Sequence, residues 1–234
     1  HYDYWDDKVR RSILFDAQAD LLVYGMGERA TRQIARRLAK GESVETLTDI
    51  RGTCYAVDAA DYIPTAAAEC PAYELVREPS DSGKRQYAIS TRIQQEEHDP
   101  IRGKAIIQRH GDKILVQNPP SLPLTTEEID ATYALPYMRN YHPSYEAVGG
   151  VPGIEEVKFS VIHNRGCIGN CNFCALAYHQ GRIISSRSHD SVVAEVQKIV
   201  KMPDFKGYIH DVGGPTADFR QPACEGQLKR GACK

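Results

Sequence analysis

Residues 157–174 read VKFSVIHNRGCIGNCNFC, and this stretch decides the fold. Its first seven residues are mostly apolar or β-branched, which predicts a buried strand. Three cysteines, Cys167, Cys171 and Cys174, follow at CxxxCxxC spacing. An iron–sulfur cubane normally takes four protein thiolates, so a local set of three suggests a 4Fe-4S cluster with one iron open to a small molecule. The pattern therefore indicates a redox enzyme.

A helix and a second strand follow the cysteines. Residues 190–200 carry apolar side chains at helical spacing, and residues 207–212 again read as a strand. Strand, helix and strand in this order predict a parallel pair with a right-handed crossover, whose strands end at the same edge. The cysteine loop and residues 213–216, which read GGPT, should therefore meet at that edge.

The alternative for the cysteines is a structural zinc site completed by His163 or His179. Such sites usually carry C-x2-C pairs, with the second pair farther along the chain. A single CxxxCxxC group directly after a strand fits that pattern poorly. We therefore favour the open cluster, around which Gly166 and Gly169 would bring backbone amides close to the inorganic sulfide.

Residues 1–60 predict a piece of an α/β unit. Residues 8–17 have helical composition, and residues 20–40 read as strand, glycine turn and helix. The turn, GMGERA at residues 25–30, formally fits a dinucleotide-binding fingerprint. Glu28 would repel a pyrophosphate at the helix N-terminus, so a plain tight turn is the better interpretation.

Residues 61–150 predict an α+β insertion. Residues 80–97 suggest a capped polar helix, residues 105–118 a hairpin around a Gly-Asp turn, and residues 125–135 a short helix that opens with a capping box. Four tyrosines follow between residues 133 and 145. They could line a substrate cleft, but packing onto a neighbouring domain is the interpretation we favour.

Composition indicates a globular chain of one or two domains. The 234 residues are 41% hydrophobic and 26% charged, and the net charge of −2 creates no field that would draw the chain to nucleic acid or membrane. No apolar run approaches the roughly 20 residues that span a bilayer. The start of the chain has no signal-peptide core, so we expect a cytoplasmic protein.

The cysteine count favours metal binding over disulfides. There are seven cysteines, an odd number, and three of them lie too close together for a disulfide framework. Cys224 and Cys233 either begin a second metal site or are two free thiols, and the sequence leaves both open. Because the chain starts at His1 and stops in a polar stretch, we expect it to be a fragment of a longer protein.

The cysteine loop, with Phe173 before its last cysteine, resembles the signature of the radical S-adenosylmethionine (SAM) superfamily. Other motifs are similar to the YgiQ-type family of uncharacterised bacterial radical SAM proteins, and they cover essentially the whole chain. These motifs are HYDYW (1–5), YGMGE (24–28), QRHGD (108–112), NPP (118–120), FCAL (173–176), HQGR (179–182) and YIHDVGGPTA (208–217).

The resemblance implies a radical SAM enzyme of unknown substrate. Cys167, Cys171 and Cys174 would bind the 4Fe-4S cluster, whose electron cleaves S-adenosyl-L-methionine to a 5'-deoxyadenosyl radical that takes a substrate hydrogen. An electron donor such as flavodoxin or ferredoxin is implied. The residues expected to contact S-adenosyl-L-methionine are Phe173, Gly213, Gly214, Pro215 and Thr216. Pro215 replaces the glutamate of the common Gly-Gly-Glu motif, which puts its role in doubt.

The expected architecture is α/β in three parts. Residues 1–60 would be the C-terminal part of a cobalamin-binding-type Rossmann-like domain, although no cobalamin-ligating histidine motif is visible in them. Residues 61–150 would be the α+β insertion with its hairpin. Residues 151–234 would be the first βαβ part of a partial TIM-type radical SAM barrel, truncated and inactive alone. The alternative function is a noncatalytic zinc-stabilised module that binds RNA or protein.

Overall fold

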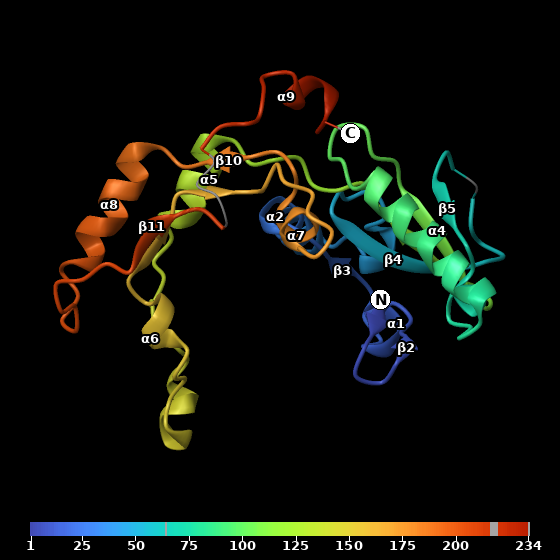
Figure 1. The fold of residues 1–234 in the computed structure, drawn as a ribbon, viewed down its shortest axis with the longest axis horizontal. Coiled ribbons are helices and arrows are strands. Elements are labelled where there is room, and N and C mark those ends of the chain that lie inside the picture. Colours follow the sequence, from blue (N-terminus) through green and yellow to red (C-terminus); the bar gives the residue numbers. More distant parts are fainter. Residues whose placement is uncertain (64, 216–219, 234) are drawn as a thin grey trace. The chain divides into compact units, whose positions relative to one another are not determined.

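The computed structural model describes residues 1–63, 65–215 and 220–233. The chain is mixed α/β and divides into two compact units, drawn in Figure 1. Unit 1 comprises His1–Leu122 and Leu228–Lys234, and unit 2 comprises Pro123–Gln227. Among the described residues, no helix is both long and apolar enough to cross a membrane.

A five-stranded sheet forms the centre of unit 1. Its order is β3-β4-β7-β6-β5, and every neighbouring pair is antiparallel except β5 and β6. In β7 the buried Ile114 and Val116 alternate with less buried residues, so one face of the sheet packs on the core. The strands are β3 (Leu22–Val23), β4 (Thr53–Asp58), β5 (Ala68–Cys70), β6 (Ile106–His110) and β7 (Lys113–Gln117).

Several helices of unit 1 contact this sheet. The longest, α4 (Asp81–Glu97), contacts β5 and β6 and supplies the crossover that their parallel pairing requires. A second helix, α2 (Glu28–Ala39), buries Ala30 against Leu47 and Ile50. The smaller elements are β1 (Tyr2–Asp3), β2 (Lys8–Val9), α1 (Ile13–Asp16), η1 (Val44–Thr46) and α3 (Tyr73–Val76).

Two local predictions for unit 1, the hairpin and the capped helix, are confirmed. The hairpin forms with His110 opposite Lys113, and Gly111 takes the positive φ of 62° that its turn requires. Helix α4 begins where expected, because the Ser80 side chain accepts a hydrogen bond from the Gly83 amide at 3.1 Å.

One expectation for residues 1–60 needs correction, and a second is not confirmed. Residues 8–17 do not form one helix: β2 pairs with β1, and Ser12 caps a helix of only four residues. The Rossmann-like character is not confirmed, because β3 pairs with β4 in the antiparallel direction. The strand, glycine turn and helix are present, but they feed a mixed sheet rather than a parallel one.

Two of the motifs quoted above, YGMGE and NPP, meet in unit 1. The Tyr24 hydroxyl donates to the carbonyl of Asn118, and the Gly52 amide donates to the carbonyl of Pro119 at 2.8 Å. The Asn118 side-chain amide donates to the carbonyls of Thr48 and Ile50 at 2.9 and 3.0 Å. Asn118 therefore fixes the loop before β4 to the end of β7.

Unit 2 contains the predicted βαβ segment. β8 (Ser160–Ile162) and β11 (Asp211–Gly213) are parallel, with α8 (His189–Ile199) between them in the chain. The first strand begins later than expected because α6 (Ile154–Val157) occupies its start. The other elements are α5 (Thr126–Tyr133), η2 (Pro143–Val148), β9 (Asn164–Arg165), α7 (Leu176–Gln180), β10 (Ser185–Ser186) and α9 (Gln227–Arg230), whose last residues belong to unit 1.

This arrangement confirms an α/β chain and leaves the finer fold open. One parallel pair in the described part of unit 2 is compatible with the start of a barrel but does not amount to one. The predicted capping box of α5 is present, with Thr125 and Glu128 each accepting a hydrogen bond from the other's amide. The three domain boundaries stay a prediction.

The final segment of the chain is fastened to unit 1 by Asp99. This buried carboxylate accepts hydrogen bonds from the amides of Ile101, Arg102 and Ala232, the last at 2.7 Å. The Arg102 guanidinium donates to the Ala232 carbonyl at 2.6 Å. A side chain at Gly231 would collide with the Asp99 carboxylate, and its φ of +82° also favours glycine.

We predict that Asp99→Asn lowers the free energy of unfolding at pH 7 by about 1–3 kcal/mol, because a buried amide cannot accept all of these bonds. Burial alone would raise the pKa of Asp99, but the amides of Arg102, Ile101 and Ala232 and the Arg102 charge together hold it below its usual 3.8. This stabilisation is present above the unfolded-state pKa and is lost as pH falls through the folded-state pKa.

Urea denaturation of wild type and variant, from neutral pH down to about pH 3, tests this linkage. The difference in unfolding free energy should shrink as the medium becomes acidic. The exposed Asp20→Asn serves as control and should match wild type throughout. A difference that stays constant across the pH range would contradict the assignment.

Candidate functional site

The cysteine loop is closed by backbone hydrogen bonds at its base. The Cys167 amide donates to the Gly181 carbonyl at 3.1 Å, and the Gly166 amide donates to Gln180 Oε1 at 3.2 Å. Gly166 has a φ of +92°, and a β-carbon there would lie 2.7 Å from the Ile183 carbonyl oxygen. Only glycine therefore allows the chain to leave β9 and enter the loop so close to the segment that leads to β10.

The three thiols lie within the loop with unequal exposure. Cys167 and Cys174 are partly exposed, and Cys171 is exposed. A β-carbon at Gly169 would stand 3.4 Å from Cys167 Sγ and 3.7 Å from Cys171 Sγ, so these two thiols flank the same glycine. The side chain of Phe173 is 93% exposed.

The thiols do not yet form a closed ligand set. Across residues 1–63, 65–215 and 220–233, no group of three or more His, Cys, Asp or Glu side chains is arranged to hold a metal ion. A cluster at this loop would therefore require the three thiols to move closer together. The metal-ligand role of the three cysteines stays a prediction.

The glycine motif ends the parallel strand beside β8. Gly213 is opposite Ile162, and its carbonyl accepts the His163 amide at 2.9 Å, so β11 lies next to the strand that leads to the cysteines. The carboxamide of Asn164 occupies the place where a β-carbon of Gly214 would be. Pro215 is the last described residue of this segment, and the predicted Thr216 lies outside the described residues.

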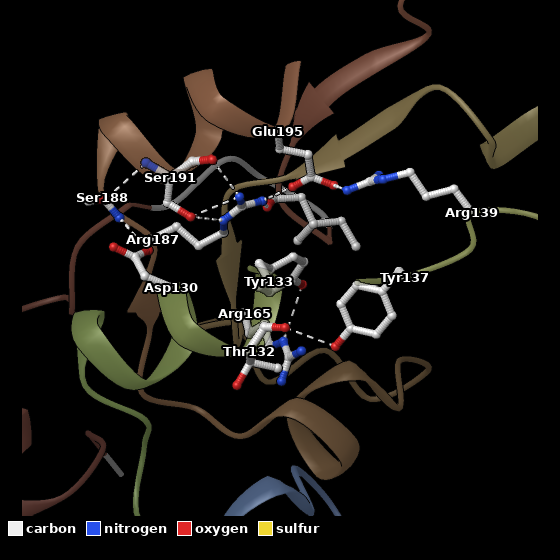
Figure 2. Close-up of polar contacts among 11 residues, drawn as sticks. Asp130, Thr132, Tyr133, Tyr137, Arg139, Arg165, Arg187, Ser188, Ser191 and Glu195 are labelled. Carbon is white, nitrogen blue, oxygen red and sulfur yellow. Dashed lines mark hydrogen bonds and ion pairs between the residues drawn. The ribbon is translucent and has the colours of Figure 1, made fainter. Parts of the chain in front are cut away.

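A buried arginine holds this edge of unit 2 together (Figure 2). Arg187, 2% exposed, donates to the Ile162 carbonyl at 2.9 Å and to the Ser191 carbonyl at 2.8 Å. It forms an ion pair with Glu195 of α8, and Glu195 pairs with Arg139 at 2.7 Å. Arg187 therefore connects the end of β8 to α8.

Tyr133 links this ion-pair group to the cysteine loop. The Arg187 guanidinium lies 4.2 Å from the centroid of the Tyr133 ring, and that of Arg165 lies 5.2 Å from it. Figure 2 shows the ring between the two arginines. Arg165 directly precedes the loop. The cation–π contact of Tyr133 with Arg165 therefore connects α5 to the start of the loop.

Sequence reasoning missed Arg187, Glu195 and Asn164. Glu195 carried a usable signal, because it stands on the apolar face of α8 between Val192 and Ile199, where a charge needs a buried partner. In the tyrosine segment, Tyr137, Met138 and Tyr145 are all at least half exposed, and a substrate cleft there stays a prediction. Tyr133 packs against Arg165 and Arg187, as described above.

The comparisons with known proteins agree with the motifs. A family model described as Radical SAM N-terminal matches residues 1–160. The chain belongs to this radical SAM family. The matched region ends where β8 begins, so the cysteine loop lies just beyond it.

Two longer proteins are similar to this chain over its whole length. A UPF0313 protein of Clostridium perfringens (strain ATCC 13124) is 53% identical over 234 residues, which is 100% of this chain and 35% of the relative. A UPF0313 protein of Clostridium botulinum (strain Okra) is 52% identical over 238 residues, covering 100% of this chain and 36% of the relative. The chain spans about a third of the length of these relatives. No solved structure matches it.

We predict that Glu195→Gln destabilises unit 2 by about 3 kcal/mol or more, because it leaves the buried Arg187 charge without its counter-ion. The measurement is the free energy of unfolding by urea, followed by circular dichroism. Glu156→Gln, an exposed glutamate of α6, is the matched control and should stay within about 0.5 kcal/mol of wild type. Equal stability of the two variants would show that the ion pair is not formed.

Proposed function

We propose that this chain is the part of a radical SAM enzyme that holds a 4Fe-4S cluster and S-adenosyl-L-methionine. The observation that carries the proposal is the CxxxCxxC loop at the carboxyl edge of the parallel β8–β11 pair, in a chain of the radical SAM family. Ligands in parallel α/β sheets bind at this edge.

The donor set suits the cluster. Thiolates are the ligands that iron–sulfur clusters take from proteins, and three of them lie within eight residues. Two already flank Gly169, which has no side chain to separate them. None of the three thiols is buried, and they would converge when the cluster binds, so metal binding and ordering of the loop would occur together.

Each predicted residue has a place in this proposal. When bound, the cluster would supply the electron that cleaves the sulfonium bond of S-adenosyl-L-methionine. Cys167, Cys171 and Cys174 would be its ligands. Flavodoxin or ferredoxin would be the electron donor. The contacts to S-adenosyl-L-methionine would come from Phe173, Gly213, Gly214, Pro215 and Thr216.

The domain assignment belongs to the same proposal. Residues 1–60 would be the end of a Rossmann-like domain, residues 61–150 the insertion, and residues 151–234 the start of a TIM-type barrel. The longer relatives supply a further two thirds of chain, enough for more strands. We therefore expect this chain to bind the cluster without turning over substrate by itself.

Anaerobic reconstitution of the chain with iron and sulfide tests the proposal. The product should contain four irons and four sulfides per chain, with the visible absorption and, after reduction, the electron paramagnetic resonance signal of a cubane. Cys171→Ala should lose most of the cluster, because it removes one of three ligands. Cys224→Ala, another exposed cysteine of unit 2, should keep it.

The outcome that overturns the proposal is specific. A chain that takes up one zinc ion and no sulfide under these conditions would be a zinc-stabilised module instead. Metal analysis by mass spectrometry and a colorimetric sulfide assay distinguish the two.

A further inference from the structure

A cavity of about 410 Å³ lies in unit 1 at the QRHGD motif, which the cluster proposal leaves unexplained. Three of its lining side chains, Arg77, Tyr73 and His110, make ring contacts. The Arg77 guanidinium lies 5.7 Å from the centroid of the Tyr73 ring, Tyr73 stacks on His110 at 5.0 Å, and His110 packs on Phe15 at 4.7 Å. A volume of this size is typical of small-molecule sites.

The His110 ring presents an unused hydrogen-bond acceptor. The Gln108 amide nitrogen donates to the Pro71 carbonyl at 2.9 Å, which turns Gln108 Oε1 toward His110 Nε2 at 3.1 Å. Nε2 must therefore carry the proton, and Nδ1 is left with its lone pair. Nδ1 is buried and has no hydrogen-bond partner among the described residues. A buried acceptor without a donor is destabilising, and a ligand that donates a hydrogen bond to it would remove this penalty.

The His110 imidazole is in its neutral form, which can accept a hydrogen bond at Nδ1. Burial is the main cause that lowers the pKa of His110, and the neighbouring Arg11 charge lowers it further, against the opposing effect of Glu74. The imidazole is therefore neutral at neutral pH. Tyr73 stacks on the ring at an interplanar angle of 14°, and Phe15 packs against it at a tilt of 44°.

The charged side chains around the cavity leave one guanidinium available. Glu74 is engaged through Oε1, which accepts the Gly111 amide at 2.9 Å. Arg77 has no carboxylate partner in the part of the chain that the structure describes. The other two arginines of the lining are already paired: Arg10 with Asp3 and Asp6, and Arg11 with Asp16.

We propose that this cavity binds a phosphate monoester in its singly protonated form, with phosphate oxygens on Arg77 and the P–O–H group donating to His110 Nδ1. An ionised carboxylate or a sulfate has no hydrogen to donate. A phosphate monoester loses its second proton near pH 6, so the donating form is well populated in weakly acidic solution. The cavity is larger than a phosphate group, which leaves space for the organic part.

Isothermal titration calorimetry of the chain with inorganic phosphate and with sulfate, at pH 6.5 and low ionic strength, tests this site. Both ions are tetrahedral, but only phosphate carries a proton. Phosphate should bind saturably and roughly tenfold more tightly than sulfate, the usual scale of one charge-assisted hydrogen bond. Arg77→Gln should weaken phosphate binding by about tenfold, because it removes the unpaired charge.

Two further variants complete the test. His110→Phe keeps an aromatic ring in the stack but removes Nδ1, and it should abolish the preference for phosphate over sulfate. Arg36→Gln, at an exposed arginine of α2, should bind phosphate like wild type. Equal affinity of wild type for the two ions, or unchanged phosphate binding by the exposed Arg77→Gln variant, would overturn the proposal. Neither result bears on the cysteine loop.

Discussion

The buried guanidinium of Arg187 is the constraint on which unit 2 depends. A charge removed from water is tolerated only with a counter-ion and a full set of hydrogen bonds. Arg187 obtains the ion from Glu195, and it donates to the carbonyls of Ile162 and Ser191. Because these partners lie on β8 and α8, satisfying one side chain fixes both elements. The edge that receives the cysteine loop is thereby set before any cofactor is present.

The cysteine loop, in contrast to Arg187, is fixed only at its base. Its base is held by amide hydrogen bonds from Gly166 and Cys167, whereas Cys171 and Phe173 project into solvent. A segment with few buried contacts opens and closes at little cost in free energy. A rigid base below a pliable ligand segment is the arrangement expected when a bound group supplies the last part of the folding energy.

Local rules predicted the parts of the fold that local interactions determine. The hairpin at Gly111, the capped helix after Ser80 and the capping box of Thr125 depend on residues that are neighbours in the chain. The βαβ order was also visible, because each of its elements has its own periodicity. The short helix at residues 154–157 was hidden, because Val157 extends an apolar run that reads as strand.

The candidate site also has features that the sequence predicts and features that it does not. The cysteine spacing is a property of eight consecutive residues and needs no structure. The Arg187–Glu195 pair and the stack at Tyr133 join residues that are far apart in the chain, which propensity and periodicity do not detect. The unused Nδ1 of His110 depends on a hydrogen bond from Gln108 to a carbonyl 37 residues away.

The Asp99 contact with Ala232 has a consequence for biosynthesis. The bond joins residues 133 positions apart, so the first unit remains incomplete while the whole second unit is being translated. At about 5–20 residues per second, that delay is on the order of ten seconds. During this time the Asp99 carboxylate lacks one of its amide donors, and the nascent chain carries an unfinished domain. The ribosome thus imposes an order in which the second unit can fold before the first is completed.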